Sequence, residues 1–158
     1  MKKIVTLAIF CVFAAGILVS QEKDPTSILK DFTRSTKMDG VNFTFTLLND
    51  KTVELMFAGD SKYSMKARAN QATTFYVQGI SDKNVTLSNT FVVEQDGQKF
   101  NCSMINIENF QGGNIAKGQR VKGLLQLDKK LNLARPFIIK SSQNQMEFKL
   151  TDSVIKEL

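Results

Sequence analysis

Carboxylates are the residues of this chain best suited to acid–base chemistry. Glycoside hydrolysis, for example, needs two of them flanking the bond that is cleaved. No motif or spacing singles out a pair, and Glu54 and Glu147 occupy outward positions of predicted strands. We interpret the acidic residues as solvated surface, so a hydrolase using carboxylates or Ser/Lys pairs is the least favoured of three functional hypotheses. The candidates considered are Glu54, Glu94, Asp96, Glu108 and Glu147.

The chain contains no histidine among its 158 residues. Ser-His-Asp and Cys-His systems both rely on an imidazole that accepts a proton near neutral pH. Many zinc, iron and copper sites need imidazole ligands. The composition therefore excludes these classes of enzyme and metal site. We predict a protein that is not an enzyme and has no catalytic residue, cofactor or metal ligand.

Two patterns resemble ligand-binding motifs but have simpler explanations. Residues 112–118 are rich in glycine, yet a phosphate-binding loop needs Gly-Lys-Ser/Thr at the start of a helix, and here Gln119 and a strand pattern follow. Asn and Asp residues cluster at 49–50, 60, 82–84 and 96 without the spacing of an EF-hand calcium loop. Each cluster falls at a predicted turn, where these residues are favoured for backbone reasons.

The first 20 residues have the features of a secretory signal peptide. Lys2 and Lys3 precede an apolar run, and small residues lie near its end. The run is somewhat shorter than the roughly 17–25 residues that a membrane-spanning helix needs. We predict cleavage after Ser20; cleavage after Gly16 and an uncleaved signal anchor are the alternatives. The mature chain is then exported to the periplasm or the extracellular space, with no membrane span.

Removal of residues 1–20 changes both the charge and the thiol content. Loss of Lys2 and Lys3 lowers the formal net charge from +6 to +4, and the remaining lysines are scattered. Scattered lysines indicate a solvated surface, so we predict no binding to nucleic acid. Cys11 is lost as well, and Cys102 stays as a lone thiol. It could pair between chains or stay reactive; we expect a thiol buried in the core, since free cysteine is usually buried.

Alternation of apolar and polar residues predicts a chain built mainly from strands. Residues 24–32 are the exception, because Asp24 can cap a short helix and Pro25 suits its first turn. Three alternating runs between Val41 and Ala67 predict an antiparallel meander with one solvated face. Asp96-Gly97 predicts a hairpin turn. Further strands are predicted at 74–80, 85–93, 99–107, 120–127, 137–140 and 145–150.

This pattern predicts one domain over residues 21–158. The expected fold is all-β, with about nine short antiparallel strands in a sandwich or barrel after one short N-terminal helix. The stretch between Thr86 and Leu150 resembles the telokinin-like, immunoglobulin-like domains of small secreted bacterial proteins. The resemblance covers about half of the mature chain and implies an immunoglobulin-like β-sandwich with no catalytic residues. It rests on Leu87, Phe91-Val92, Gly97, Phe100, Asn109-Phe110, Lys117-Gly118, Val121–Leu125, Phe137–Ile139 and Met146–Leu150.

This sequence lacks the cysteine pair and the core tryptophan that mark antibody-type domains.

The first functional hypothesis is a non-catalytic exported protein that acts through contact with an unknown protein partner. Leu48 and Met56 are the candidate contact residues, because they are apolar on predicted strand faces that are otherwise polar. The alternative is a carrier of a lipid or other apolar ligand in a β-lined cavity, since phenylalanines are frequent in the predicted meander.

Overall fold

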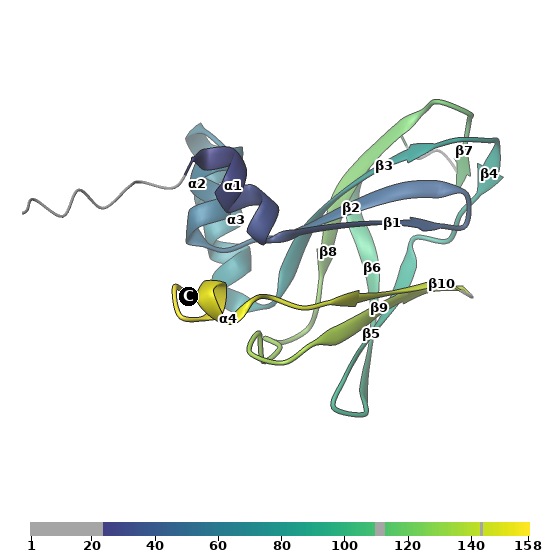
Figure 1. Cartoon of the computed structure of the whole chain (residues 1–158). Helices are drawn as coiled ribbons and strands as arrows, with labels where there is room; N and C mark the ends of the chain where they lie inside the picture. Colours follow the sequence, from purple (N-terminus) through teal and green to yellow (C-terminus); the bar gives the residue numbers. More distant parts are fainter. Residues whose placement is uncertain (1–23, 110–112, 143) are drawn as a thin grey trace, which may run out of the picture.

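The computed structural model describes residues 24–109, 113–142 and 144–158, and the predicted signal peptide lies outside the described residues. The described chain is mostly β, and the paired strands are antiparallel (Figure 1). The all-β prediction is therefore confirmed. Eight strands form the main sheet in the order β1-β2-β3-β8-β6-β5-β9-β10. They are β1 Thr33–Met38, β2 Val41–Leu47, β3 Thr74–Ser81, β5 Thr90–Gln95, β6 Gln98–Glu108, β8 Arg120–Gln126, β9 Phe137–Ser141 and β10 Asn144–Phe148.

The sheet curls until its two edge strands, β1 and β10, approach each other (Figure 1). Side chains bridge this seam. The carboxylate of Asp39 accepts hydrogen bonds from the Ser141 hydroxyl at 2.8 Å and from the Asn144 amide at 2.7 Å. At the other end, the Arg34 guanidinium donates to the backbone oxygen of Lys149. The result is a nearly closed barrel made from one continuous sheet, and it is not clearly the two-sheet immunoglobulin sandwich that we expected.

Helices gather at one end of this barrel, and a small two-stranded sheet lies at the other (Figure 1). The predicted N-terminal helix is confirmed, with Pro25 in its first turn. The small sheet pairs β4 with β7, so the predicted strand 85–93 is interrupted between β4 and β5. These elements are α1 Pro25–Asp31, α2 Asp50–Met56, α3 Gly59–Gln71, α4 Asp152–Ile155, β4 Val85–Thr86 and β7 Asn114–Ile115.

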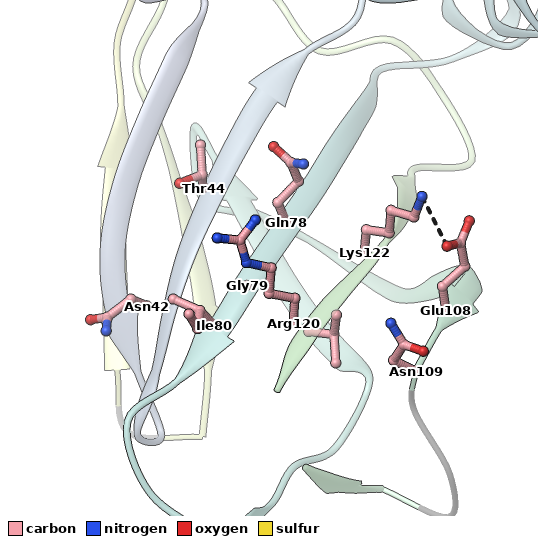
Figure 2. Close-up of a pocket in the computed structure, with 10 residues that line it drawn as sticks. Asn42, Thr44, Gln78, Gly79, Ile80, Glu108, Asn109, Arg120 and Lys122 are labelled. Atoms are coloured by element: carbon pink, nitrogen blue, oxygen red, sulfur yellow. Dashed lines mark ion pairs between the residues drawn. The ribbon is translucent and has the colours of Figure 1, made fainter. Parts of the chain in front are cut away.

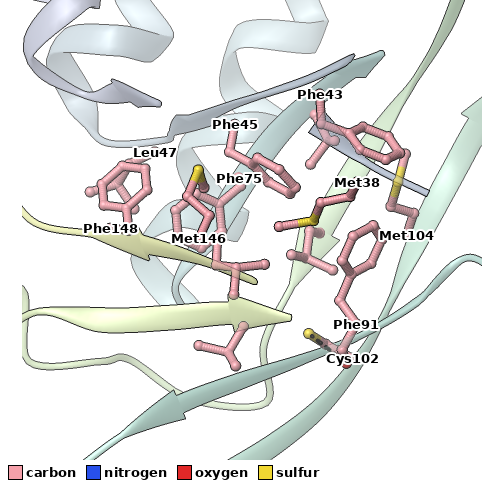
Figure 3. Packing of buried hydrophobic residues seen from close by; sticks show 14 of the residues in the cluster. Met38, Phe43, Phe45, Leu47, Phe75, Phe91, Cys102, Met104, Met146 and Phe148 are labelled. Atoms are coloured by element: carbon pink, nitrogen blue, oxygen red, sulfur yellow. Dashed lines mark hydrogen bonds between the residues drawn. The ribbon is translucent and has the colours of Figure 1, made fainter. Parts of the chain in front are cut away.

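Phenylalanine rings fill the inside of the barrel (Figure 3). The ring of Phe91 meets those of Phe43 and Phe45 edge to face, with 5.9 Å between centroids in each pair. Phe137 and Phe148 stack at 5.1 Å. All five rings are buried, and edge-to-face and stacked arrangements add to the stabilisation that burial provides. The core is thus formed by strands that are distant in the sequence, and it holds the curled sheet together.

The predicted meander between Val41 and Ala67 is correct only in its first strand, β2. Its second and third runs are the helices α2 and α3. A capping box starts α2: the Asn49 side chain accepts from the Thr52 backbone N–H, and the Thr52 hydroxyl accepts from the Asn49 N–H, both at 2.9 Å. Reciprocal caps satisfy backbone donors that a helix start leaves unpaired. The two-residue alternation of this segment predicts a strand, whereas the capping box starts a helix.

The N-terminal helix ends at Asp31, and residues 33–38, for which the sequence pattern predicts no strand, form β1. This strand lies at the sheet edge, and most of its residues are only partly buried, so it lacks the alternation that marks a half-buried strand. Asp39 and Gly40 have positive φ angles of 52° and 87° in the turn to β2. Two successive positive angles are what a tight hairpin turn requires.

Helices α2 and α3 cover one end of the barrel's outer surface. Val53 of α2 is fully buried against Leu48 and against Leu124 of β8. Phe57, which follows α2, meets Tyr76 of β3 edge to face at 5.6 Å. Both Leu124 and Tyr76 point away from the phenylalanine core, so the helices create a second, smaller apolar cluster on the outside of the sheet. The rest of the outer face on these strands stays uncovered.

Two glycines of the sheet lie against close neighbours. A Cβ atom added to Gly79 of β3 would lie 2.8 Å from Val41 Cγ1 and 3.0 Å from two carbons of the Phe43 ring. A Cβ atom added to Gly123 of β8 would lie 3.0 Å from the backbone oxygen of Ile105. Real Cβ atoms essentially never lie as close to a neighbour as 2.8 Å, so a side chain at Gly79 would force Val41 to shift. The 3.0 Å approach at Gly123 is tighter than nine in ten real Cβ contacts.

We expect Gly79→Ala to lower the free energy of unfolding by about 1–3 kcal/mol, because Val41 and the Phe43 ring must shift to admit the methyl group. Urea denaturation of the purified protein measures the change. The matched control is Gln78→Ala on the exposed face of the same strand, for which we expect a change within about 0.5 kcal/mol. Equal stability of Gly79→Ala and the parent protein would contradict the packing argument.

Candidate functional site

The uncovered part of the outer sheet face carries a regular array of mainly polar side chains. In the row nearer the β4–β7 end, Asn42 of β2 lies opposite Ile80 of β3, and Ile80 lies opposite Arg120 of β8. The next row is equivalent, with Thr44, Gln78 and Lys122. Residues directly opposite each other have Cβ atoms about 4.5–5.5 Å apart. We call these six residues and their β1 neighbours Lys37 and Ser35 the outer-face grid.

The grid arises from the same alternation that buries the core. Val41, Phe43, Val77 and Val121 point inward, so the residues between them must point outward. A shallow pocket of about 500 Å³ lies over β2, β3 and β8 (Figure 2). The end of β6 forms one of its sides, because the ladder between β6 and β8 shifts register between Ile105 and Glu108, where Asn106 has a φ angle of 51°. This bulge sets Glu108 opposite Lys122.

Ion pairs neutralise two of the cations of the outer-face grid. The Lys122 ammonium lies 2.9 Å from the Glu108 carboxylate, and this hydrogen bond raises the pKa of Lys122 (Figure 2). Lys37 pairs with Asp82, and this contact lowers the pKa of Asp82. Both pairs are exposed to solvent, where they contribute little stability. Their effect is to give each ammonium group an internal carboxylate partner.

Arg120 differs from these lysines. Its exposed guanidinium has no hydrogen-bond or ion-pair partner within the described residues. The amide groups of Asn42 and Gln78 are likewise unpaired in that part of the chain. Figure 2 shows the Arg120 side chain lying across β3, with its guanidinium directed toward Gln78 and Thr44. Among the described residues, the pocket therefore presents a free cation beside free amides.

The groups in this pocket suit binding better than bond cleavage. The Thr44 hydroxyl is hydrogen-bonded to the Ser35 hydroxyl at 2.9 Å, which supplies no base to activate it. A raised pKa keeps Lys122 protonated, so it is a cation and not a nucleophile. Over residues 24–109, 113–142 and 144–158, no group of three or more acidic or cysteine side chains is placed to hold a metal ion. Hydrogen bonding and charge are what the pocket offers.

The two contact residues predicted from the sequence lie elsewhere. Leu48 follows β2 and is buried, with 4% of its surface exposed. Met56 lies in α2 and is half-buried against the second apolar cluster. The expectation that both would be exposed on polar strand faces is therefore wrong. Met56 belongs to a helix that packs on the sheet, and Leu48 is buried against Val53 of that helix. Their role in partner contact stays a prediction.

Cys102 is placed as expected. It lies on β6 between Phe100 and Met104, points into the core and is 7% exposed (Figure 3). Its thiol donates a long hydrogen bond of 3.6 Å to the backbone oxygen of Phe91. Burial, with a smaller contribution from Asp128, raises the pKa of the thiol to about 12. A thiol that stays protonated at neutral pH is a poor nucleophile.

The residues of the grid were partly visible in the sequence. The alternation in residues 120–127 already placed Arg120 and Lys122 on a polar face. Their meeting with Asn42 and Gln78 depends on the pairing of β2, β3 and β8, which lie far apart in the chain. The alternation along a strand shows which of its side chains share a face, but it does not show which strands pair. The site itself could therefore not be predicted from the sequence.

Comparison of the chain with protein-family models, curated proteins and solved structures returned no match. In the described part of the chain, no helix is both long and apolar enough to cross a membrane.

We expect the thiol of Cys102 to react very slowly with Ellman's reagent in the native protein. With a pKa of about 12, roughly one thiol in ten thousand is ionised at pH 8, against about a quarter for an unperturbed cysteine. The labelling rate should rise about tenfold per pH unit below the pKa. The same reaction in denaturant is the control and should be fast. Rapid labelling of the folded protein would show that the thiol is accessible.

Proposed function

We propose that this chain is an exported, non-catalytic recognition protein that binds another protein through the outer-face grid. The observation that carries the proposal is the exposed Arg120 guanidinium, unpaired within the described residues, beside the free amides of Gln78 and Asn42. Polar groups arranged in register on a rigid sheet are already in place for a partner, which lowers the entropic cost of binding. Export rests on residues 1–20.

The interior of the barrel supports this proposal over the carrier alternative. An apolar ligand needs a lined cavity, usually several hundred Å³ in volume. Here the space between the strands is occupied by side chains, including the fully buried rings of seven phenylalanines, six of them on the main sheet's strands. A ligand would have to displace well-packed rings, at considerable energetic cost.

Membership of the immunoglobulin-like family stays a prediction that rests on the resemblance of residues 86–150. The proposed contact does not depend on it, because the grid uses β1, β2, β3 and β8 and follows from their register alone. A fold does not by itself specify a function.

A photo-crosslinking amino acid at position 80 tests the proposed contact surface in the organism that produces the protein. Ile80 lies in the middle of the grid and is 40% exposed. We expect one dominant crosslinked protein, which excess unlabelled parent protein competes away. Crosslinkers at Met56 and at Tyr63, which is 73% exposed on α3, serve as matched positions outside the grid.

The comparison between positions decides the outcome. A competed product at position 80 but not at position 63 supports the grid as the contact surface. A competed product only at position 56 would return the contact to the residue first predicted from the sequence. Equal products at all three positions, or none, would overturn the proposal.

A further inference from the structure

We propose that the outer-face grid recognises a carboxylate on an acidic, extended segment of the partner protein, with Arg120 as its principal ligand. This inference rests on the proposed function and specifies the chemistry of the partner.

The surroundings of the grid are positively charged. Two loops meet beside its first row: Gly118 N–H donates to the Ser81 backbone oxygen, and Lys117 N–H donates to the Asn84 side chain. These loops bring Lys83 and Lys117 to the same end of the barrel as Lys37, Arg120 and Lys122. Against these five cations stand three carboxylates, Asp39, Asp82 and Glu108, which gives a formal net charge of +2. An acidic partner is attracted to such a surface and steered toward it.

Arg120 is the cation best suited to a carboxylate. A guanidinium is planar and presents two parallel N–H donors that match the two oxygens of a carboxylate. Lys37 and Lys122 already have carboxylate partners, whereas Arg120 has none in the described chain. A ligand carboxylate therefore makes two charge-assisted hydrogen bonds there without first breaking an internal ion pair.

The rims of the pocket select against a densely charged polyanion. Glu108 lies at one side of the grid and Asp82 at the other, each paired to a lysine. A chain with a charge on every unit, such as a nucleic acid, would bring phosphates against these two carboxylates. A protein segment with spaced acidic residues places its charge at Arg120 and neutral groups at the rims.

The amides fix the extended conformation of the ligand. Neighbouring strands lie about 4.8 Å apart, so Asn42 on β2 lies about 10 Å from Arg120 on β8 across β3. An extended segment covers this distance with about three residues, at roughly 3.3 Å per residue. The Asn42 and Gln78 amides can then donate to and accept from its backbone, while the exposed Ile80 side chain, between Asn42 and Arg120, contacts its apolar groups.

The test is an NMR titration of the purified protein with a short synthetic peptide in which glutamate alternates with threonine. We expect shift changes at the backbone amides of Gln78, Ile80 and Arg120. Arg120→Gln should weaken binding roughly tenfold or more, and the affinity should fall as salt is raised from about 50 mM to about 300 mM. The control is Arg135→Gln, since Arg135 is also exposed but pairs with Asp96 at 2.9 Å on the β5–β6 hairpin. We expect it to bind like the parent protein.

Each alternative result would overturn the inference. The first is equal binding of the peptide with glutamine in place of glutamate. The second is an unchanged affinity of Arg120→Gln, with shift changes spread over other basic surfaces. The third is tighter, Arg120-dependent binding of polygalacturonate, which would make the partner an acidic polysaccharide.

The crosslinked partner separates this inference from the proposed function. If the segment captured at position 80 contains acidic residues, and Arg120→Gln abolishes capture, both stand. If that segment is neutral and capture survives Arg120→Gln, the contact surface is right and its chemistry is wrong. If position 80 captures nothing, the proposed function itself fails.

Discussion

The structure depends on one constraint: a single sheet must bury its own apolar face. A sheet with one apolar face is stable only when that face is covered. Here the sheet curls, so rings from β2, β5, β9 and β10 pack against one another instead of against a second layer. Gly79 and Gly123 permit close approaches between neighbouring strands in this packing. Curling brings the edge strands together, and the side chains of Asp39 and Arg34 bridge what remains open.

The same constraint determines where function can lie. Side chains on a strand alternate between faces, so a fully apolar interior leaves the outer face for polar groups. The helices α2 and α3 cover one part of that face through Leu124 and Tyr76. What stays open is the row of residues nearer the β4–β7 end, including Arg120. The interior, by contrast, holds a thiol whose raised pKa keeps it protonated.

The sequence predicts a strand correctly where apolar and polar residues alternate and nothing else indicates a helix. The prediction is wrong where alternation and a helix-start signal occur in the same segment. Alternation located β3, β6, β8, β9 and β10 closely, and Asp96-Gly97 marked the β5–β6 turn correctly. Residues 52–57 alternate too, but the Asn49–Thr52 capping box starts a helix there. Neither the curl of the sheet nor the grid was predictable, because both depend on pairing between segments such as β3 and β8, which lie about 45 residues apart.

Closure and recognition are separable in this fold. Asp39 has a positive φ, which aspartate tolerates better than most residues, and its carboxylate joins β1 to the start of β10. Opening this seam would move β1 and, with it, Lys37 and Ser35. Asn42, Ile80 and Arg120 lie on β2, β3 and β8, which are paired on both sides. Their spacing is set by backbone ladders that the seam does not share. Arg120, whose guanidinium has no partner among the described residues, therefore lies in the part of the grid that motion at the barrel edge disturbs least.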